Sequence, residues 1–302
     1  MNRLLTFIKA AIRPLFTFAA ILFTWQVTEN IVNSLRRKQE RTSLEFFIPS
    51  PINILNSFIT NFPNIQTSIG DTLLKAAIGF TIGAILALIF AIAYFLWPRL
   101  RGSTLAIAYT VSSFPITGLA PVIVLAFGQG SKLSIVAVAV LVCYFPILIS
   151  MDGAFHMIDK KFTDYLHIYG ATRLDLIRYV LLPLSMPAFF VSLRLSLPAS
   201  IVGAIIGEWM GANHGVGRLM ILSVYEMKAG LLWACMFEVA TVCAATALAV
   251  EAIGKKVVFW DRGSDDVETP KRQTRRVSRS ARSPGTRPIS RGRHPSFKEV
   301  YS

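Results

Sequence analysis

Three ionisable residues stand inside long apolar stretches of this sequence: Arg194, Glu208 and Glu238. A charge at membrane depth is costly and should face a cavity or a partner. Arg194 is near one end of its stretch, so it either reaches the membrane surface with its long side chain or contributes to binding a solute. Glu208 ends the same stretch. It is either a structural acid whose charge is paired within the protein or a residue near the outer mouth of a path through the membrane. Glu238 stands deepest, and its alternatives are a hydrogen bond between subunits and a place on a path through the membrane.

Catalytic chemistry is not indicated elsewhere in the chain. ATP hydrolysis needs a glycine-rich loop ending in Gly-Lys-Ser or Gly-Lys-Thr. The nearest strings, residues 128–132 and 254–256, lack that spacing. His156 and His167 have no metal-type spacing around them and are interpreted as surface residues. We therefore expect no enzyme, metal site or cofactor in this chain.

The elements that carry these residues are long and apolar. Among the 302 residues, 53% are hydrophobic and 16% are charged, with a mean hydropathy of +0.53, whereas soluble domains carry about 25% charged residues. Six stretches each reach the roughly 20 residues that cross a bilayer as a helix. They are Pro14 to Val32, Thr72 to Leu96, Thr104 to Phe127, Leu133 to Met151, Ala188 to Gly207 and Leu231 to Val250. This predicts an all-α membrane protein with about six transmembrane helices, and excludes a soluble enzyme, a secreted disulfide scaffold and a disordered chain.

Several features inside the stretches bear on packing. The first stretch is interpreted as an uncleaved anchor, although a secretory signal or an interfacial segment, leaving five spans, are alternatives. Gly79, Gly83 and Ala87 form a small-residue ridge, better explained by packing within the chain than by a dimer seam. Four prolines provide possible bends in the third, fourth and fifth stretches, and three cysteines are interpreted as core residues. These are Pro115, Pro121, Pro146 and Pro198, and Cys143, Cys235 and Cys243.

Basic residues give the orientation. With six spans and a cytoplasmic N-terminus, the inner segments hold 22 Lys and Arg and the outer ones 7, or 11 against 7 without the tail. The positive-inside rule therefore puts both termini in the cytoplasm, despite a basic cluster near Arg36 on the outside. The transmembrane domain is residues 1–260. Residues 261–302 form a basic Ser/Arg/Pro-rich tail with net charge +6 that is expected to be disordered. It either binds anionic lipid of the cytoplasmic leaflet or is a solvated tail with no binding role, and nucleic acid is not an expected partner.

The loop from Asp152 to Pro187 has the most specific pattern. Gly170 allows a chain reversal, and Thr172 with Asp175 three residues later resembles a capping box that starts a helix. The apolar positions that follow at helical spacing are Leu174, Ile177 and Leu181. Such a helix-turn-helix, apolar on one side, could dock into a groove of a cytosolic partner.

This loop resembles the signature of permease subunits of bacterial ATP-binding-cassette (ABC) importers, which reads Glu-Ala-Ala, three residues, Gly, nine residues, Ile-x-Leu-Pro. Here Gly170, Leu182 and Pro183 match, Val180 replaces Ile and Asp164 replaces Glu, whereas Tyr165 and Leu166 depart from the two alanines. Further fragments resemble the nitrate, sulfonate and taurine branch of that family. They are Phe47 to Pro51, Ala126 to Gly130, Phe145 to Leu148, Leu193 to Leu195, Gly207 to Ala212 and Gly215 to Gly217.

The resemblance implies a type I importer permease fold and an inner-membrane location. It implies a cytosolic ATP-binding subunit that carries ATP and Mg, an extracytoplasmic solute-binding protein, and a second copy of the chain. It also implies that a surface groove of the ATPase receives the loop, through residues of this chain that are matched to the signature. These are Asp164, Tyr165, Leu166, Gly170, Ala171, Val180, Leu182 and Pro183. The solutes that it suggests are nitrate, sulfonates, taurine or vitamin precursors.

Two other classes of function are weighed against this one. An ion-gradient-driven secondary transporter or channel is the main alternative, but many such transporters show paired repeats with broken helices, and residues 1–130 do not resemble 131–260. An intramembrane enzyme would need a catalytic constellation within the spans, and none is recognisable there.

Overall fold

The structure is a computed structural model that describes residues 24–28, 30–31, 49–158, 165–166 and 168–261. Every regular element among these residues is a helix, which confirms the all-α prediction. The elements in chain order are α2 (Pro51–Leu96), α3 (Pro98–Ser113), α4 (Ile116–Phe127), α5 (Lys132–Met157), α7 (Arg173–Leu176), the π-helical turn η1 (Ile177–Leu181), α8 (Leu182–Trp209), α9 (Val216–Tyr225), α10 (Ala229–Val257) and the 3-10 turn η2 (Phe259–Asp261). The first predicted span falls largely outside the described residues, and so does the predicted tail apart from Asp261.

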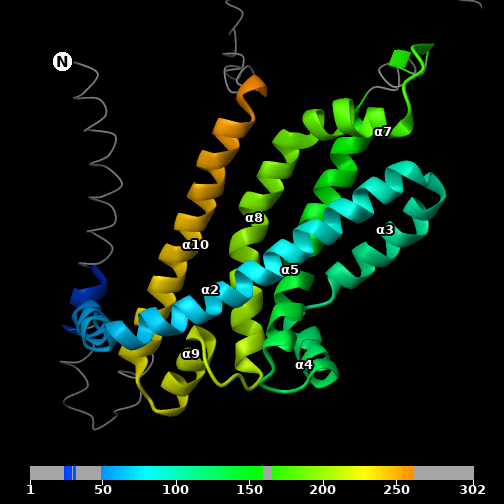
Figure 1. The fold of residues 1–302 in the computed structure, drawn as a ribbon. Helices are drawn as coiled ribbons and strands as arrows, with labels where there is room; N and C mark the ends of the chain where they lie inside the picture. The colour runs from blue at the N-terminus through cyan, green and yellow to red at the C-terminus, as the bar shows by residue number, and fades with distance from the viewer. Residues whose placement is uncertain (1–23, 29, 32–48, 159–164, 167, 262–302) are drawn as a thin grey trace, which may run out of the picture. The chain divides into compact units, whose positions relative to one another are not determined.

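Four helices are long and apolar enough to cross a membrane: α2, α5, the run from α7 to α8, and α10. Each contains one of the predicted stretches. α2 is longer than predicted because Ser50 caps it early, accepting a hydrogen bond from the Asn53 amide at 3.2 Å. Pro51 follows at the first helical position, where its missing N–H costs nothing. α7 and the C-terminal end of α10 lie at one end of the helices, and α4 and α9 at the other (Figure 1).

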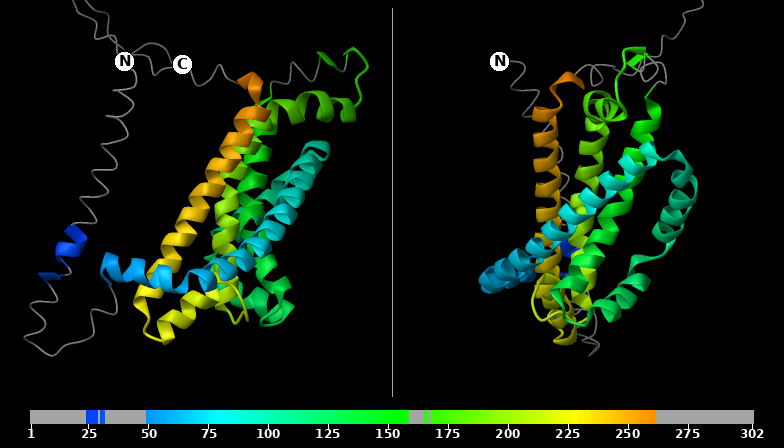
Figure 2. Two further views of the ribbon diagram at one scale, coloured as in Figure 1. Left: turned by 60° about the vertical axis from the view of Figure 1, so that its left-hand side comes forward. Right: turned by 45° about the vertical axis from the view of Figure 1, so that its right-hand side comes forward.

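The predicted stretch Thr104 to Phe127 is broken at Pro115, one of the four prolines named as possible bends. The chain forms α3 and α4 there, bent by 103° at Phe114 and Pro115, as a broken span or a re-entrant pair. Phe114 is extended, with φ −72° and ψ 136°, because a residue before proline is sterically driven out of the helical region. α4 packs against α5, whereas α3 contacts α2 and α5 only in part and stands out from the long helices (Figure 2). Pro121, Pro146 and Pro198 lie inside helices that continue past them.

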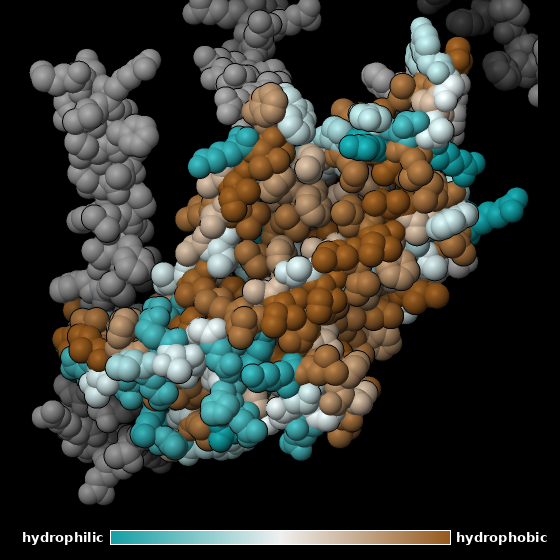
Figure 3. Space-filling model, viewed as in Figure 1, coloured by the Kyte–Doolittle hydropathy of each residue, from teal (hydrophilic) through white to brown (hydrophobic). Residues whose placement is uncertain are grey.

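α5 packs between α2 and α8 through glycines that bring the backbones close together. A Cβ on Gly83 would lie 2.5 Å from Cys143 Sγ, and one on Gly79 would lie 2.6 Å from Ala139 Cβ. From the other side, a Cβ on Gly203 would lie 3.1 Å from Ala139 Cα. The small-residue ridge of α2 therefore packs within the chain, as predicted. Figure 3 shows apolar surface over the middle of these helices, with hydrophilic residues gathered toward the N-terminal part of α2.

Gly83→Ala is expected to destabilise the protein by about 1–3 kcal/mol, because one added carbon overpacks the contact with Cys143. The matched control is Gly70→Ala in the same helix, where a Cβ meets nothing within 4 Å. That change should be neutral or stabilise by up to about 1 kcal/mol through the unfolded chain. Thermal unfolding of both variants in detergent measures the difference, and equal midpoints would contradict the close packing.

Candidate functional site

The chain reverses at Gly170, between two helical pieces of the segment 165–183. Gly170 has φ +76°, a left-handed conformation that glycine adopts without strain. Apart from its two chain neighbours, no described residue has an atom within 4 Å of where its Cβ would be. The Ala171 amide donates to the Leu166 carbonyl at 3.0 Å and closes the turn. Asp164 lies outside the described residues.

A capping box then starts α7, as predicted. The Asp175 amide donates to Thr172 Oγ1 at 3.3 Å, and the Thr172 amide donates to Asp175 Oδ2 at 2.9 Å. Two amides at the helix start, where no intrahelical carbonyl is available, are thereby satisfied. The direction of the segment after Gly170 is fixed by these two side chains.

The predicted apolar stripe is divided between two sides of the segment. Leu174 is 72% exposed, whereas Ile177 and Leu181 are buried within the chain together with Leu176, so of the three stripe residues only Leu174 is open to a partner. The cause is the π-helical turn η1, whose wider hydrogen-bonded loops change the spacing of side chains along a face. This turn precedes Pro183 in the first turn of α8, which has no N–H to donate to the preceding turn.

The segment 165–183 is tied to the long helices. Leu176, Ile177 and Leu181 pack in one apolar cluster with Tyr94 of α2 and Met151 of α5, among others. The Arg173 guanidinium also donates to the Leu96 carbonyl, the last residue of α2, at 3.2 Å. A displacement of the segment would therefore act directly on α2 and α5, which it contacts.

The outer side of the same segment carries large apolar and aromatic side chains with little cover. Within the described part of the segment they are Tyr165, Ile168, Tyr169, Leu174 and Tyr179, and the least covered, Tyr169, is 86% exposed. Contiguous exposed apolar surface marks an interaction site more often than chance. We call these five residues the apolar patch.

A buried charge cluster lies at the far end of α8, formed by Asp71, Thr72, Lys75 and Glu208. Glu208 is 1% exposed, and Lys75 Nζ donates to Glu208 Oε1 at 2.9 Å and to Asp71 Oδ2 at 2.7 Å. Thr72 Oγ1 lies 2.9 Å from both Glu208 oxygens. The cluster ties the middle of α2 to the end of α8, and each buried charge has an opposite partner, as burial requires.

Two glycines allow the backbone to approach Glu208. The Gly217 amide donates to Glu208 Oε2 at 2.9 Å, and a Cβ on Gly215, whose φ is +124°, would collide with the carboxylate. The Val216 amide between them donates to Thr72 Oγ1 at 2.8 Å. The fragment Gly215 to Gly217 is thus the backbone lining of the buried carboxylate.

A family model described as binding-protein-dependent transport system inner membrane component matches residues 79–258, which is more than half of the chain. The chain belongs to this family. The match includes the segment 165–183 and Glu208, whereas Asp71 and Lys75 precede it.

Curated relatives agree with this assignment. The chain is 27% identical over 208 residues to the formylaminopyrimidine transport permease protein ThiX of Halalkalibacterium halodurans, covering 68% of this chain and 79% of the relative. It is 27% identical over 215 residues to the putative aliphatic sulfonates transport permease protein SsuC of Escherichia coli (69% and 76%). It is 30% identical over 149 residues to the riboflavin transport system permease protein RibX of Chloroflexus aurantiacus (49% and 55%).

A solved structure shares the fold. A chain from inward-facing structures of the MetNI methionine ABC transporter superposes with a TM-score of 0.54 at 17% identity, covering 65% of this permease and 95% of that chain. The permease is therefore a multi-pass inner-membrane subunit of an ABC import system, a family that implies ATP-binding subunits and substrate-binding proteins. These relatives are transport proteins, and they lend no support to the gradient-driven alternative.

The other ionisable residues singled out in the sequence occupy less buried places. Arg194 forms an ion pair with Glu251 of α10 at 2.9 Å, and Glu238 is half-buried, accepting a hydrogen bond from Gln66 of α2 at 3.0 Å. The expectation that Glu238 is the most buried of the three is wrong, because Glu208 is the most buried.

Sequence reasoning missed Lys75 and Asp71. A usable signal was present, since an acid stands four residues before a lysine at the start of an apolar stretch.

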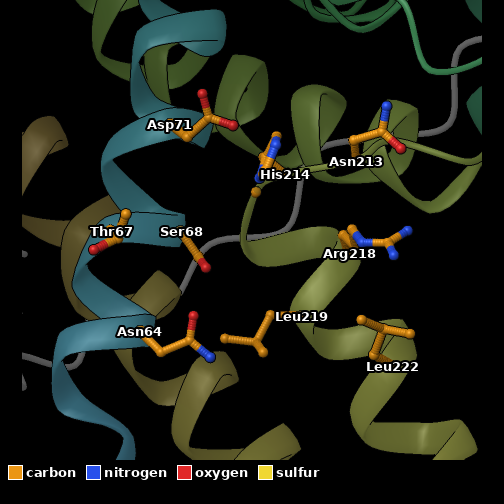
Figure 4. A pocket seen from close by; sticks show the side chains of 10 residues that line it. Asn64, Thr67, Ser68, Asp71, Asn213, His214, Arg218, Leu219 and Leu222 are labelled. Atoms are coloured by element: carbon orange, nitrogen blue, oxygen red, sulfur yellow. The ribbon is translucent and has the colours of Figure 1, made fainter.

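A pocket of about 400 Å³ adjoins the charge cluster, between the N-terminal part of α2 and the loop that enters α9 (Figure 4). Its lining residues are Asn64, Thr67, Ser68, Asp71, Asn213, His214, Gly215, Arg218, Leu219 and Leu222. We call it the α2–α9 pocket. Among the described residues, no group of three or more His, Cys, Asp or Glu could hold a metal ion.

Proposed function

We propose that this permease forms the translocation pathway of an ATP-driven importer and couples to a cytosolic ATPase through the loop of residues 152–187. The observation that carries the proposal is the apolar patch on the segment 165–183. It is exposed on the outer side, while the inner side of the same segment packs against α2 and α5. A partner that grips the patch would therefore move the membrane helices. ATP and Mg act on that partner, and this chain supplies no catalytic residue.

The proposed orientation puts the apolar patch and both chain termini in the cytoplasm. Its support is the excess of Lys and Arg on the inner segments, including Lys255 and Lys256 in the last turn of α10, at the same end as α7 (Figure 1). The α2–α9 pocket then faces the extracytoplasmic side, where a solute-binding protein delivers its cargo. The cargo is a small organic solute, since the relatives are named for formylaminopyrimidine, aliphatic sulfonates and riboflavin.

Two copies of the permease build the pathway in this proposal. One chain offers four or five spans among the described residues, a thin wall around a solute path. Large apolar side chains exposed along α2 and α8, such as Ile85, Ile89 and Leu195, supply surface for a second copy or for lipid.

Native mass spectrometry of the complex purified from its own host, through a tag on this chain, tests the proposal. The expected mass contains two copies of this chain and two ATP-binding subunits. A complex without an ATP-binding subunit would refute the coupling proposal. One copy of this chain beside a different permease would refute the homodimer alone.

A further inference from the structure

Two charged residues that line the α2–α9 pocket, Asp71 and Arg218, have hydrogen-bonding capacity that no described residue uses. Asp71 bonds to Lys75 through Oδ2, and the described residues supply no partner for Oδ1. Arg218 donates from Nη1 to the Ala212 carbonyl at 2.9 Å, and no described residue accepts from its Nε or Nη2. The neighbouring Lys75 also bonds to Glu208 and to the His214 carbonyl, so its three N–H groups are already used.

Both charged groups are held in place without a ligand. Asp71 is fixed by an ion pair to a lysine whose side chain is only 5% exposed. Arg218 is fixed by its bond to the loop that lines the pocket. Groups that are already positioned lose little conformational entropy when a ligand binds, which favours affinity.

The pairing of charges selects the kind of ligand. Asp71 and Arg218 line the same pocket, so a ligand with a single charge can offer an opposite charge to only one of them. A molecule with both charges satisfies both sites. The remaining lining offers side-chain amides and hydroxyls from Asn64, Asn213 and Ser68, with Leu219 and Leu222 to cover a short carbon chain. The volume, about 400 Å³, is in the range of small-molecule sites.

We propose that the α2–α9 pocket binds a small zwitterionic solute, with its cationic group at Asp71 and its anionic group at Arg218. The inference rests on the proposed function, because a solute would reach this end of an importer first. It adds a solute-binding site on the permease chain itself and names the charge pattern that the site recognises.

The test uses the assembled complex in phosphatidylglycerol nanodiscs, with binding followed by saturation-transfer NMR and calorimetry. The probes are two zwitterions, taurine and glycine betaine, and two half-probes, ethanesulfonate and tetramethylammonium. We expect at least one zwitterion to bind about tenfold or more tightly than either half-probe, the scale of one charge-assisted contact. No binding of either zwitterion, or equal binding of a half-probe, would overturn the proposal.

Single substitutions assign the two ends of the ligand. Asp71→Asn should remove the preference for taurine over ethanesulfonate, which is expected to be about tenfold. Arg218→Gln should remove the preference for glycine betaine over tetramethylammonium, which is expected to be about tenfold as well. The matched controls are Glu226→Gln and Lys228→Gln, an exposed ion pair at the same end with a distance of 2.8 Å. They should change neither preference. Preferences that survive both pocket substitutions would overturn the assignment.

Two further arms make the result unambiguous. Leu222→Trp is expected to fill the pocket from a residue outside the charge cluster, so it should abolish zwitterion binding even if Asp71→Asn does not fold.

Adding phosphatidylethanolamine to the nanodiscs tests whether the zwitterion that the pocket binds is a lipid headgroup. Loss of taurine binding there would reassign the pocket to a lipid headgroup and overturn the solute proposal. ATP hydrolysis is measured on the same samples: a complex that hydrolyses ATP but binds no zwitterion refutes only the pocket, whereas absence of the ATPase subunit refutes the proposed function.

Discussion

Lys75→Met is expected to lower the free energy of unfolding of the permease by about 3–5 kcal/mol, the cost of leaving a buried charge without its partner. Methionine has nearly the length of lysine, so packing changes little. Glu208 would keep its contacts with Thr72 and the Gly217 amide but lose its only ion pair among the described residues. Unfolding in dodecyl maltoside with increasing SDS, followed by tryptophan fluorescence, measures the loss, and Trp209 directly follows Glu208 in the sequence.

A second substitution separates the charge effect from a packing effect. Lys75→Met combined with Glu208→Gln removes the two most buried charges of the cluster. It should recover at least half of the lost stability, because the one charge then left without its ion pair is that of Asp71, whose side chain is 27% exposed to solvent. Lys255→Met is the surface control. Its ion pair with Glu251 at 2.7 Å is exposed and is expected to contribute less than about 1 kcal/mol. A Lys75→Met variant that unfolds at the wild-type SDS fraction would contradict a structural role for the cluster.

The features that the sequence predicts correctly are local ones. Thr172 and Asp175 are three residues apart, and their capping box follows from backbone geometry that any helix start shares. The turn at Gly170 likewise depends on the φ angle of one residue. Neither feature needs information about distant parts of the chain. For that reason, the start of α7 can be predicted from the residues of the loop alone.

The features that the sequence analysis misses depend on distant contacts. Lys75 and Glu208 are 133 residues apart, and nothing near either residue identifies the other. The bend at Pro115 has a similar origin: four prolines are available, and whether one breaks a helix depends on neighbours that satisfy the freed carbonyls. The single docking stripe predicted from Leu174, Ile177 and Leu181 is divided, with Leu174 exposed and the other two buried, because a regular helix was assumed through η1, where the turn is π-helical.

Gly170→Val is expected to uncouple the permease from its ATPase while leaving it in the membrane. A valine at φ +76° is strained, because its branched Cβ clashes with the backbone in the left-handed region. The turn must then adopt another conformation, which moves Tyr169 and redirects α7. Apart from the two chain neighbours, no described residue has an atom within 4 Å of a Cβ at position 170, so the described helices beyond the turn have no reason to change.

The measurement is ATP hydrolysis by the reconstituted complex, together with retention of the ATP-binding subunit on the tagged permease, at matched membrane levels. We expect Gly170→Val to reduce at least one of the two about tenfold. Gly170→Asn should keep most of both, because asparagine tolerates the left-handed conformation. Gly102→Val is the control for added bulk, since Gly102 also has open space around it but lies within α3 without a positive φ. Wild-type hydrolysis and retention in a well-inserted Gly170→Val protein would show that the segment 165–183 does not carry the coupling. The apolar patch would then need a different partner.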